Sequence, residues 1–533
     1  MTKRNFAALA VLALLSFSGL NAQNVSRESS KRNVLLEDFT GYKCGNCPDG
    51  HKIANTIVLS HPTQIYPVSI HAGMFASPAG VDAPDFRTSE GTAINDYFNV
   101  SSYPTGLVNR RYNDANEKVQ GRSRWTTSCR EQVTQTAEVN VWAKATYDQS
   151  TKTLSADVEL YYTADVEDGT SALCVSLLQS NIKGPQAGSD QEDLYSHNHV
   201  LRAMFTPVWG DTIASSVKGT LVTKHYEYVV PEEIENIATD PLNFDIVAYV
   251  INPEKEVMNV NGCKVSCPGM TLPLGATLES YKLQPSRNYG FNFFECNLVN
   301  NGTDALTSAT FKMTFDGEDE QEYTWTAGAD NAISFRDRGY VSFPVSLPAS
   351  VVSGGCDYTL TLTALNGQAY AGNTVKGSFG SMIATTGALK AVITTDNQAA
   401  DNTFRLLDAS GKTVAEYGPF TDGEVSTNTV TIAFPADGTY CFEVADAWGN
   451  GILTPRGNVK IYDANDNLLV SNNGILDFGW RAFFSYTSST GIHNATVSSN
   501  AADAVYDLFG RRVAKPAKGQ LYISNGKKLI NTK

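Results

Sequence analysis

Apolar and polar positions in residues 33–136 follow the pattern of a small α/β unit. Strands and helices are expected to alternate as strand 34–39, helix 49–60, strand 65–71, helix 86–98, strand 102–109 and helix 116–135. The first of these is an unbroken apolar run, which predicts a buried strand. Strands that alternate with helices in this way predict partly parallel pairing.

From about residue 137 the pattern changes to alternating apolar and polar residues separated by turn-rich segments. This alternation is typical of antiparallel β-sandwiches. We expect β-sandwiches at residues 137–266, 270–380 (immunoglobulin-like) and 384–487 (sandwich or jelly-roll-like), then a short β-unit at 489–533. The predicted fold class is therefore multi-domain and mainly β, with one α/β domain at the N-terminus.

The first 22 residues have the pattern of a signal peptide. Lys3 and Arg4 form a positive n-region, and residues 6–17 form an apolar h-region. That run is shorter than the roughly 20 apolar residues of a transmembrane helix, and no second run of that length follows. We expect export, a mature chain without a transmembrane segment, and a location outside the cytoplasm.

Length and charge narrow the functional classes. A chain of 533 residues is too long for one hydrophobic core, so several domains are expected. Its net charge is −14 and its pI is about 5. A surface with this negative charge repels phosphate backbones, so no nucleic-acid partner is expected. No serine-nucleophile elbow, phosphate-binding glycine loop or His-Glu-x-x-His motif occurs, which disfavours hydrolase chemistry.

Cys44 and Cys47 are the strongest candidates for chemistry. Two cysteines separated by two residues follow a buried strand and open a helix. Free amide groups and the partial positive charge at a helix N-terminus stabilise a thiolate, the nucleophile of disulfide exchange. Cys44 is expected to be exposed and to attack, and Cys47 to resolve the mixed disulfide. His51 either tunes this pair or only caps the surface.

The segment 38–47 resembles the strand-loop-helix signature of the thioredoxin superfamily. The resemblance implies that Asp38 is the buried acid that helps to deprotonate the resolving thiol. Glu37 points to the opposite face of a regular strand. The segment 100–105 resembles the family's loop with a cis proline, so Pro104 is expected to shape the substrate groove. Lys43 replaces the family's tryptophan, and the dipeptide between the cysteines is Gly-Asn rather than Gly-Pro. Because that dipeptide tunes the redox potential, the direction of the redox chemistry stays open.

A more specific resemblance is to the outer-membrane protein family whose founder is called Omp twenty-eight. It rests on the stretch 34–41, the Cys-Gly-Asn-Cys-Pro motif at 44–48, and the segments 197–202 and 246–250. It covers about residues 33–265. Membership of this family implies a thioredoxin-like domain followed by a β-sandwich. It says more about the compartment and the fold of the protein than about its activity.

Other interpretations of the cysteines stay open. A Cys-x-x-Cys pair in an exported protein can be a static disulfide, and the chain would then be a non-enzymatic surface adhesin or binding protein. Zinc would need two more ligands with suitable spacing, and none is evident. Among the other cysteines, Cys296 with Cys356 and Cys263 with Cys267 are plausible bridges.

No cofactor is predicted, although two weaker signals could bind metals. His197 and His199 would share one face of a strand and could chelate a metal with a third ligand, with packing as the alternative. Residues 446–451 and 463–467 are rich in oxygen donors, which suits calcium but also tight turns.

The last 45 residues resemble the C-terminal sorting domain of the type IX secretion system. The resemblance rests on a Gly-x-x-Val turn at 510–513, a strand at 518–523 and a basic turn at 525–528. It implies that the secretion machinery is a partner, that the tail is removed, and that the protein is attached to surface lipopolysaccharide or released. Together with the outer-membrane family resemblance, it implies a secreted or outer-membrane cell-surface location. Protein thiols and disulfides are the partners expected for the cysteine pair.

Overall fold

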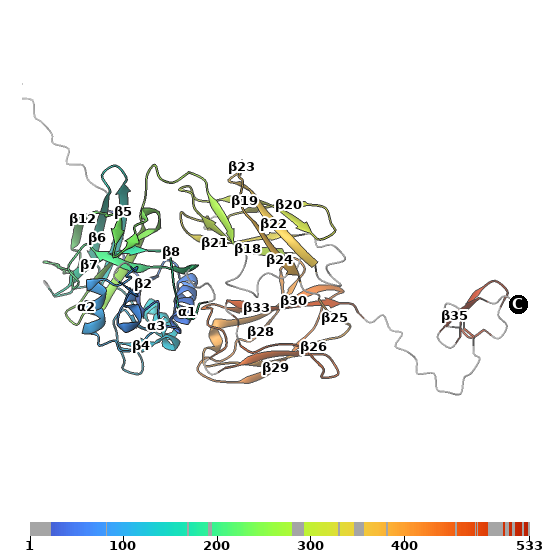
Figure 1. The fold of residues 1–533 in the computed structure, drawn as a ribbon. Coiled ribbons are helices and arrows are strands. Elements are labelled where there is room, and N and C mark those ends of the chain that lie inside the picture. The colour runs from blue at the N-terminus through green and yellow to red at the C-terminus, as the bar shows by residue number, and fades with distance from the viewer. Residues whose placement is uncertain are drawn as a thin grey trace, which may run out of the picture.

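The computed structural model describes most of the chain and shows a mainly β protein with several sheets (Figure 1). The described residues are 23–80, 83–167, 170–189, 194–279, 293–328, 331–345, 356–379, 382–453, 456–474, 476, 478–488, 505–506, 511–513, 517–524 and 527–530. The expected signal peptide lies outside them. In the described part of the chain, no helix is long and apolar enough to span a bilayer.

The N-terminal unit begins with the alternation of strands and helices that the sequence predicts. Its elements are β1 (Val34–Thr40), α1 (Cys47–Ser60), β2 (Ile65–His71), α2 (Ser89–Tyr97), β3 (Thr105–Val108), β4 (Gln120–Gly121) and α3 (Trp125–Thr134). β1 pairs in parallel with β2 and antiparallel with β3. Leu36 of β1 packs with α1 and α3, whereas Leu35 and Phe39 pack on the other face with Ile94 of α2.

Helix α3 begins nine residues later than the predicted helix at 116–135. Residues at the start of that range are held at the sheet edge instead. Gln120 pairs with Gly106 of β3, and its side-chain carbonyl accepts a hydrogen bond from Ser128 at 2.6 Å. This edge pairing removes the first part of the predicted helix.

The sheet of the α/β region continues into the region predicted as a separate sandwich. The nine-stranded sheet has the order β16-β15-β7-β10-β2-β1-β3-β4, and β11 pairs with β7. The added strands are β7 (Ala172–Gln179), β10 (Val200–Met204), β11 (Asp211–Thr212), β15 (Phe244–Ile251) and β16 (Val257–Lys264). Val200 pairs in parallel with Ser69 at the junction. The expected boundary at residue 136 therefore does not separate two sheets, because the free edge of β2 is used for pairing.

A three-stranded sheet covers one face of this long sheet. It has the order β12 (Leu221–Val229), β6 (Thr153–Tyr162) and β5 (Val139–Asp148). Alternate residues of β6, among them Leu154, Val158 and Tyr162, are fully buried against Leu177 and Ile246 of the long sheet. Burial of alternate apolar side chains fixes the register of these strands. Two short pairs, β8 (Ile182–Gly184) with β9 (Tyr195–His197) and β13 (Glu233–Ile234) with β14 (Ile237–Ala238), are connected to this unit.

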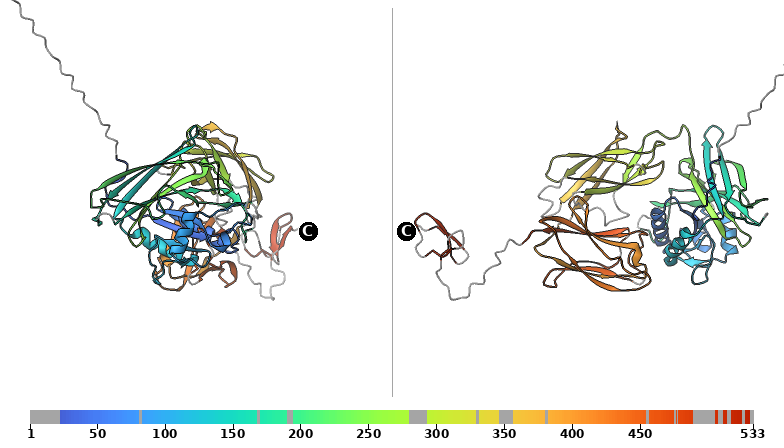
Figure 2. Two further views of the ribbon diagram at one scale, coloured as in Figure 1. Left: turned by 60° about the vertical axis from the view of Figure 1, so that its left-hand side comes forward. Right: turned by 180° about the vertical axis from the view of Figure 1, so that it is seen from behind.

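Two further β-units follow, each with two sheets around an apolar core (Figures 1 and 2). The second unit contains β17 (Ala276–Glu279), β18 (Phe293–Asn300), β19 (Ser308–Phe315), β20 (Gln321–Thr326), β21 (Arg338–Pro344), β22 (Cys356–Leu365), β23 (Gln368–Ala369) and β24 (Thr374–Phe379). The third contains β25 (Ile383–Thr385), β26 (Leu389–Thr394), β27 (Asn402–Asp408), β28 (Thr413–Tyr417), β29 (Thr427–Ile432), β30 (Gly438–Asp446), β31 (Asn458–Tyr462), β32 (Leu468–Asn472) and β33 (Gly479–Tyr486).

The third unit packs against the helices α1 and α3. The Trp448 ring stacks on His61 with centroids 4.2 Å apart, and the Arg130 guanidinium lies 5.3 Å from the same ring. Arg130 also forms an ion pair with Asp401. On α1 this interface lies at the C-terminal end, away from Cys44 and Cys47.

Of the two further cysteine bridges expected, the one between Cys263 and Cys267 is not formed. Cys263 and Cys267 are separate thiols, because Cys263 lies on β16 while the Cys267 thiol points to the Pro241 carbonyl at 3.3 Å. The side chain of Cys356 is outside the described part, so its pairing with Cys296 stays a prediction. At the C-terminus, β34 (Leu521–Ser524) pairs with β35 (Lys527–Ile530), whereas Gly510 of the expected sorting motif is not described.

Candidate functional site

Cys44 and Cys47 form a disulfide where β1 passes into α1. β1 ends at Thr40, the chain turns, and α1 begins at Cys47 with Pro48 in its first turn. The Cα atoms of the two cysteines are 5.4 Å apart. The Cys44 amide donates to the Gly41 carbonyl at 2.9 Å, which closes the turn before the helix. The sequence thus places the pair at a helix N-terminus, as predicted.

The prediction that Cys44 is exposed is wrong, because only 3% of the surface of Cys44 is exposed. Cys47 is fully buried. Residues 185–189, which we call the cover segment, lie across the turn. The Gln186 side-chain amide donates to the Cys44 carbonyl at 3.0 Å, and the Ala187 amide donates to the Tyr42 carbonyl at 2.7 Å. Gly188 packs so closely on Gly45 that a Cβ atom would collide with the Gly45 carbonyl.

Asp38 lies beneath the first turns of α1 without a hydrogen-bond partner. Asp38 and Thr40 are two residues apart on β1, so both side chains face the helix. Asp38 is 1% exposed, and neither carboxyl oxygen has a hydrogen-bond partner. Burial raises the pKa of Asp38 to about 8. This carboxyl group is therefore able to bind or release a proton near neutral pH.

His51 connects Asp38 with a second part of the chain. Its Nε2 atom lies 2.8 Å from Thr40 Oγ1 and 3.7 Å from Asp38 Oδ2. Its Nδ1 atom lies 2.7 Å from the Tyr195 hydroxyl, which belongs to β9. Burial, with a smaller contribution from His197, lowers the pKa of His51 to about 3, so the ring stays neutral. The structure thus assigns His51 to the interior, where the sequence had left a surface role open.

Glu37, the neighbour of Asp38, is buried on the other face and fully paired. Its carboxylate accepts hydrogen bonds from the Arg110 guanidinium at 2.8 Å and 2.6 Å. Arg110 also donates to the Tyr249 hydroxyl at 3.2 Å. Glu37 is therefore part of a structural ion pair, and Asp38 alone faces the helix that carries the disulfide.

Pro104 lies next to the start of α1. The Tyr103–Pro104 peptide bond is cis, as the sequence predicts. The Tyr103 carbonyl is 3.6 Å from Cys44 Sγ. Gly50 of α1 faces Pro104, and a Cβ atom on Gly50 would stand 2.9 Å from the Pro104 Cβ. Proline and disulfide thus share one end of the helix, although a role of Pro104 in binding a substrate stays a prediction.

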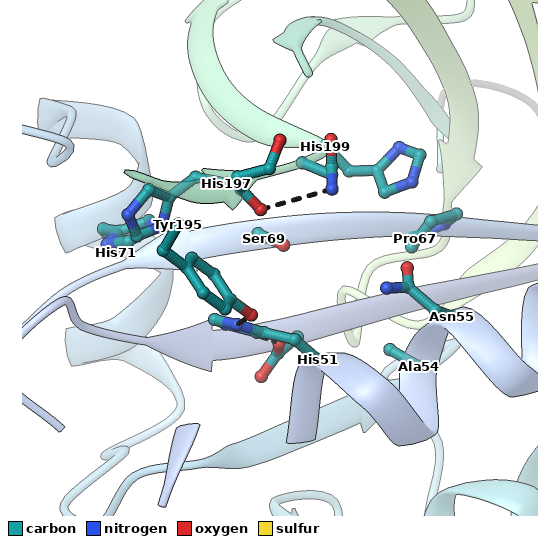
Figure 3. A pocket seen from close by; sticks show the side chains of 12 residues that line it. His51, Ala54, Asn55, Pro67, Ser69, His71, Tyr195, His197 and His199 are labelled. Carbon is teal, nitrogen blue, oxygen red and sulfur yellow. Dashed lines mark hydrogen bonds and ion pairs between the residues drawn. The ribbon is translucent and has the colours of Figure 1, made fainter. Parts of the chain in front are cut away.

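A polar pocket opens beside Asp38 and His51 (Figure 3). In Figure 3, Tyr195 extends from β9 towards His51 on α1, and His71 and His197 stand at one side. The residues lining it are Asp38, His51, Ala54, Asn55, Pro67, Ser69, His71, Tyr195, Ser196, His197, Asn198 and His199. Residues from α1, β1, β2 and β9 therefore meet at one cavity.

The expectation that His197 and His199 share one strand face is wrong. β9 ends at His197, and His199 has a φ of 55°, which breaks the strand before β10. His197 instead lies 3.1 Å from the Pro185 carbonyl through Nε2, at the base of the cover segment. Among the described residues, no group of three or more histidine, cysteine or acidic side chains has a metal-binding arrangement.

The expected calcium loops are held by hydrogen bonds of their own. The Asp446 carboxylate accepts from the amides of Trp448, Gly449 and Gly451. The Asp463 carboxylate accepts from the amides of Asn465 and Asn467. These contacts are typical of tight turns, and calcium binding stays a prediction.

Sequence reasoning missed Tyr195, His71 and Gln186 as members of this site. Tyr195 is 144 residues away from its partner His51. Gln186 is 142 residues away from Cys44. No spacing or motif signals such contacts, because they follow from the pairing of β10 with β2, which carries the β8–β9 region over α1.

Comparison with known proteins supports the location of the protein. Residues 91–267 match the family model described as Outer membrane protein Omp28. The outer-membrane, cell-surface location implied by the family resemblances is thereby confirmed. The matched segment contains Pro104, Tyr195 and His197, whereas Asp38, Cys44 and Cys47 precede it. No curated protein matches the chain.

Several solved structures are similar to parts of the chain. HBP35 of Porphyromonas gingivalis is 18% identical, with 65% of this chain and 98% of that chain covered and a TM-score of 0.36. A domain of the outer membrane lipoprotein Omp28 from the same organism is 24% identical, with coverage of 25% and 90% and a TM-score of 0.19. Protein AGR_C_4864 from Agrobacterium tumefaciens is 11% identical, with coverage of 45% and 95% and a TM-score of 0.28. These TM-scores are all below 0.5, so the statement about location rests on the match to the family model and not on the solved structures.

Proposed function

We propose that the N-terminal unit carries out thiol–disulfide exchange with protein thiols and disulfides outside the cytoplasm. The observation that supports this most is a buried carboxyl group without a partner, Asp38, beneath the helix that begins with the disulfide. An unpaired buried carboxyl group lowers stability, and such groups cluster at functional sites. A thioredoxin-like role explains why this residue is not an apolar one.

The proposed roles follow the order of the exchange reaction. A partner thiolate attacks Cys44 Sγ, a new disulfide forms, and the electron pair of the Cys44–Cys47 bond goes to Cys47. In the reverse direction, Asp38 accepts the proton of the Cys47 thiol, and the resulting thiolate expels the partner. Pro104 lies where the partner chain would approach Cys44. The cover segment must move before the partner reaches the sulfur.

Catalysed exchange by the full chain tests this proposal. The assay follows the refolding of a disulfide-scrambled protein in a glutathione buffer. The wild-type chain is expected to raise the rate at least about tenfold, and the variant Cys44→Ser to abolish the increase, because the nucleophile is lost. Cys263→Ser, which removes a half-buried thiol outside the site, serves as the control. Equal rates for the wild type and Cys44→Ser would contradict the proposal.

The burial of both sulfur atoms favours a second candidate function. A disulfide closed off by the cover segment suits a static cross-link in a non-enzymatic surface adhesin or binding protein, in which the β-units bind the ligand. The two functions differ in how easily the bond is reduced, because structural disulfides of secreted proteins have potentials below about −300 mV.

Secretion and surface attachment are proposed from the C-terminal sequence. We propose the type IX secretion machinery as a partner, and lipopolysaccharide as the surface anchor after the tail is removed. A chain that ends at residue 488 is expected to stay inside the cell envelope, whereas the full chain reaches the surface. Equal surface exposure of both chains in a protease-shaving assay would contradict this proposal.

A further inference from the structure

The pocket beside the disulfide connects a buried carboxyl group with the surface. Asp38 has no hydrogen-bond partner of its own. His51 stands between Asp38 and Tyr195, at 3.7 Å from the carboxyl oxygen and 2.7 Å from the hydroxyl. Tyr195 is partly exposed and belongs to β9, so the connection ends at the outer side of the pocket.

On the basis of the proposed function, we propose that His51 and Tyr195 carry the proton between Asp38 and solvent in each exchange cycle. The two residues are then positioning and proton-transfer residues of the disulfide centre, although neither contacts the sulfur atoms. The proposal rests on a series of groups that starts at an otherwise isolated carboxyl group: a gap of 3.7 Å separates Asp38 Oδ2 from His51 Nε2, and His51 Nδ1 lies at hydrogen-bond distance from the Tyr195 hydroxyl. Thr40, 2.8 Å from His51 Nε2, fixes the ring in this orientation.

The proton balance of the cycle requires that Asp38 pass a proton to solvent. During closure of the disulfide, the Cys47 thiol gives its proton to the Asp38 carboxylate, and the Cys47 thiolate attacks Cys44 and expels the partner as a thiolate. Asp38 must then release this proton before the next cycle. Once the 3.7 Å gap between Asp38 Oδ2 and His51 Nε2 closes, the Asp38 proton passes to Nε2 in place of the Thr40 hydrogen bond, the Nδ1 proton passes to the Tyr195 oxygen, and Tyr195 releases its own proton to water. When the disulfide is next reduced, Cys47 takes a proton from Asp38, and the same groups carry a proton inwards, which restores the Nδ1–H form of His51.

The surroundings of His51 require that the transfer be concerted. The groups that face it are Asp38 from β1, His71 from β2, and Tyr195 and His197 from β9. A charged imidazolium is disfavoured there by burial and, to a smaller extent, by His197. Burial, together with the charge of Asp38, raises the pKa of Tyr195 to about 12, so its hydroxyl keeps its proton at rest. Entry of a proton at one ring nitrogen must therefore accompany release from the other.

Two substitutions in the full chain test the relay. His51→Gln keeps a hydrogen-bonding side chain without a second titratable nitrogen, and Tyr195→Phe removes only the hydroxyl. Each is expected to lower the rate of exchange with glutathione about tenfold to hundredfold, because general acid–base groups contribute factors of that size or more. The pH dependence of the rate is expected to flatten, while the reduction potential stays unchanged. Added imidazole is expected to restore the rate of His51→Ala.

Matched controls remove the same groups elsewhere. His225→Gln changes an exposed histidine on β12, and Tyr66→Phe removes a hydroxyl bonded to Thr63 and Asn261 on the other face of β2. Both are expected to exchange at the wild-type rate. Unchanged rates and pH profiles in both Tyr195→Phe and His51→Gln would overturn the relay, even if exchange itself is intact. A wild-type chain that does not exchange at all would overturn the proposed function instead.

Discussion

The two faces of β1 bury acidic residues in opposite ways. Glu37 and Asp38 are adjacent, and each is 1% exposed. Glu37 has two short hydrogen bonds to Arg110, whereas Asp38 has none. The two acids are equally buried but differ in their hydrogen-bond partners. These partners, rather than burial, decide whether a buried acid stabilises the fold or can exchange a proton.

The difference separates a stabilising acid from a reactive one. For the paired Glu37 carboxylate, the Arg110 guanidinium compensates for the loss of water. The Asp38 carboxyl group has no such partner, so burial raises its pKa to about 8 and it takes up a proton more readily. We therefore expect that substitutions on the Glu37 face change stability alone, and that substitutions on the Asp38 face change exchange chemistry and the pH dependence of stability.

The largest effect is expected from Arg110→Met. This substitution leaves the Glu37 carboxylate buried without a partner, which costs about 3–5 kcal/mol of folding free energy. Denaturant unfolding of the full chain, followed by a signal from the N-terminal unit, measures the loss. The double variant Glu37→Leu/Arg110→Met should lose much less. A single variant as stable as the wild type would show that the ion pair is not structural.

Asp38→Asn is expected to stabilise the protein, and more so at high pH. The folded-state pKa of about 8 lies above the ordinary value of 3.8, so the folded state holds a proton that the unfolded state has already released. The wild type therefore loses stability as pH rises from about 4 to 8, and the asparagine variant does not. The gain should be several kcal/mol at pH 8 and close to zero at pH 4.

Unfolding curves of the wild type and Asp38→Asn at pH 4, 6 and 8 provide the measurement. Asp337→Asn removes an exposed carboxylate of the second unit and serves as the control. A stability difference between the wild type and Asp38→Asn that does not change with pH would mean that Asp38 is ionised in the folded state.

A smaller effect is expected at the cover segment. Gln186→Ala removes the hydrogen bond to the Cys44 carbonyl, which contributes about 0.5–1.5 kcal/mol. The population with an accessible disulfide, and hence the rate of reduction by dithiothreitol, should rise about twofold to tenfold. Gln135→Ala, an exposed position at the end of α3, is the control. A lower rate in Gln186→Ala would contradict a shielding role.

Local patterns predicted the individual elements, and β1, β2 and the cysteine turn lie where the apolar runs and turn residues place them. A period of two along β1 also separated Glu37 from Asp38 correctly. The extent of the sheet was not predictable, because alternation shows which face of a strand is buried and not which strand lies beside it. The parallel contact of Val200 with Ser69 joins segments that are 131 residues apart.

The same limit applies to the site. Cys44, Cys47 and Asp38 are close in sequence, so their arrangement follows from one strand, one turn and one helix. Tyr195 and Gln186 reach them only through the long-range sheet. Burial of Cys44 also depends on the cover segment, and a local pattern cannot show that a distant loop lies over a helix N-terminus.

The reduction potential of the Cys44–Cys47 pair in the full chain tests the central claim most directly. Equilibration with glutathione buffers and trapping of the free thiols gives the potential. The account predicts a reversible couple between about −120 and −270 mV, the range of working oxidoreductases, with a Cys44 thiol pKa below the ordinary value of about 8.5. A bond that resists reduction below about −300 mV would identify a structural disulfide and contradict the account.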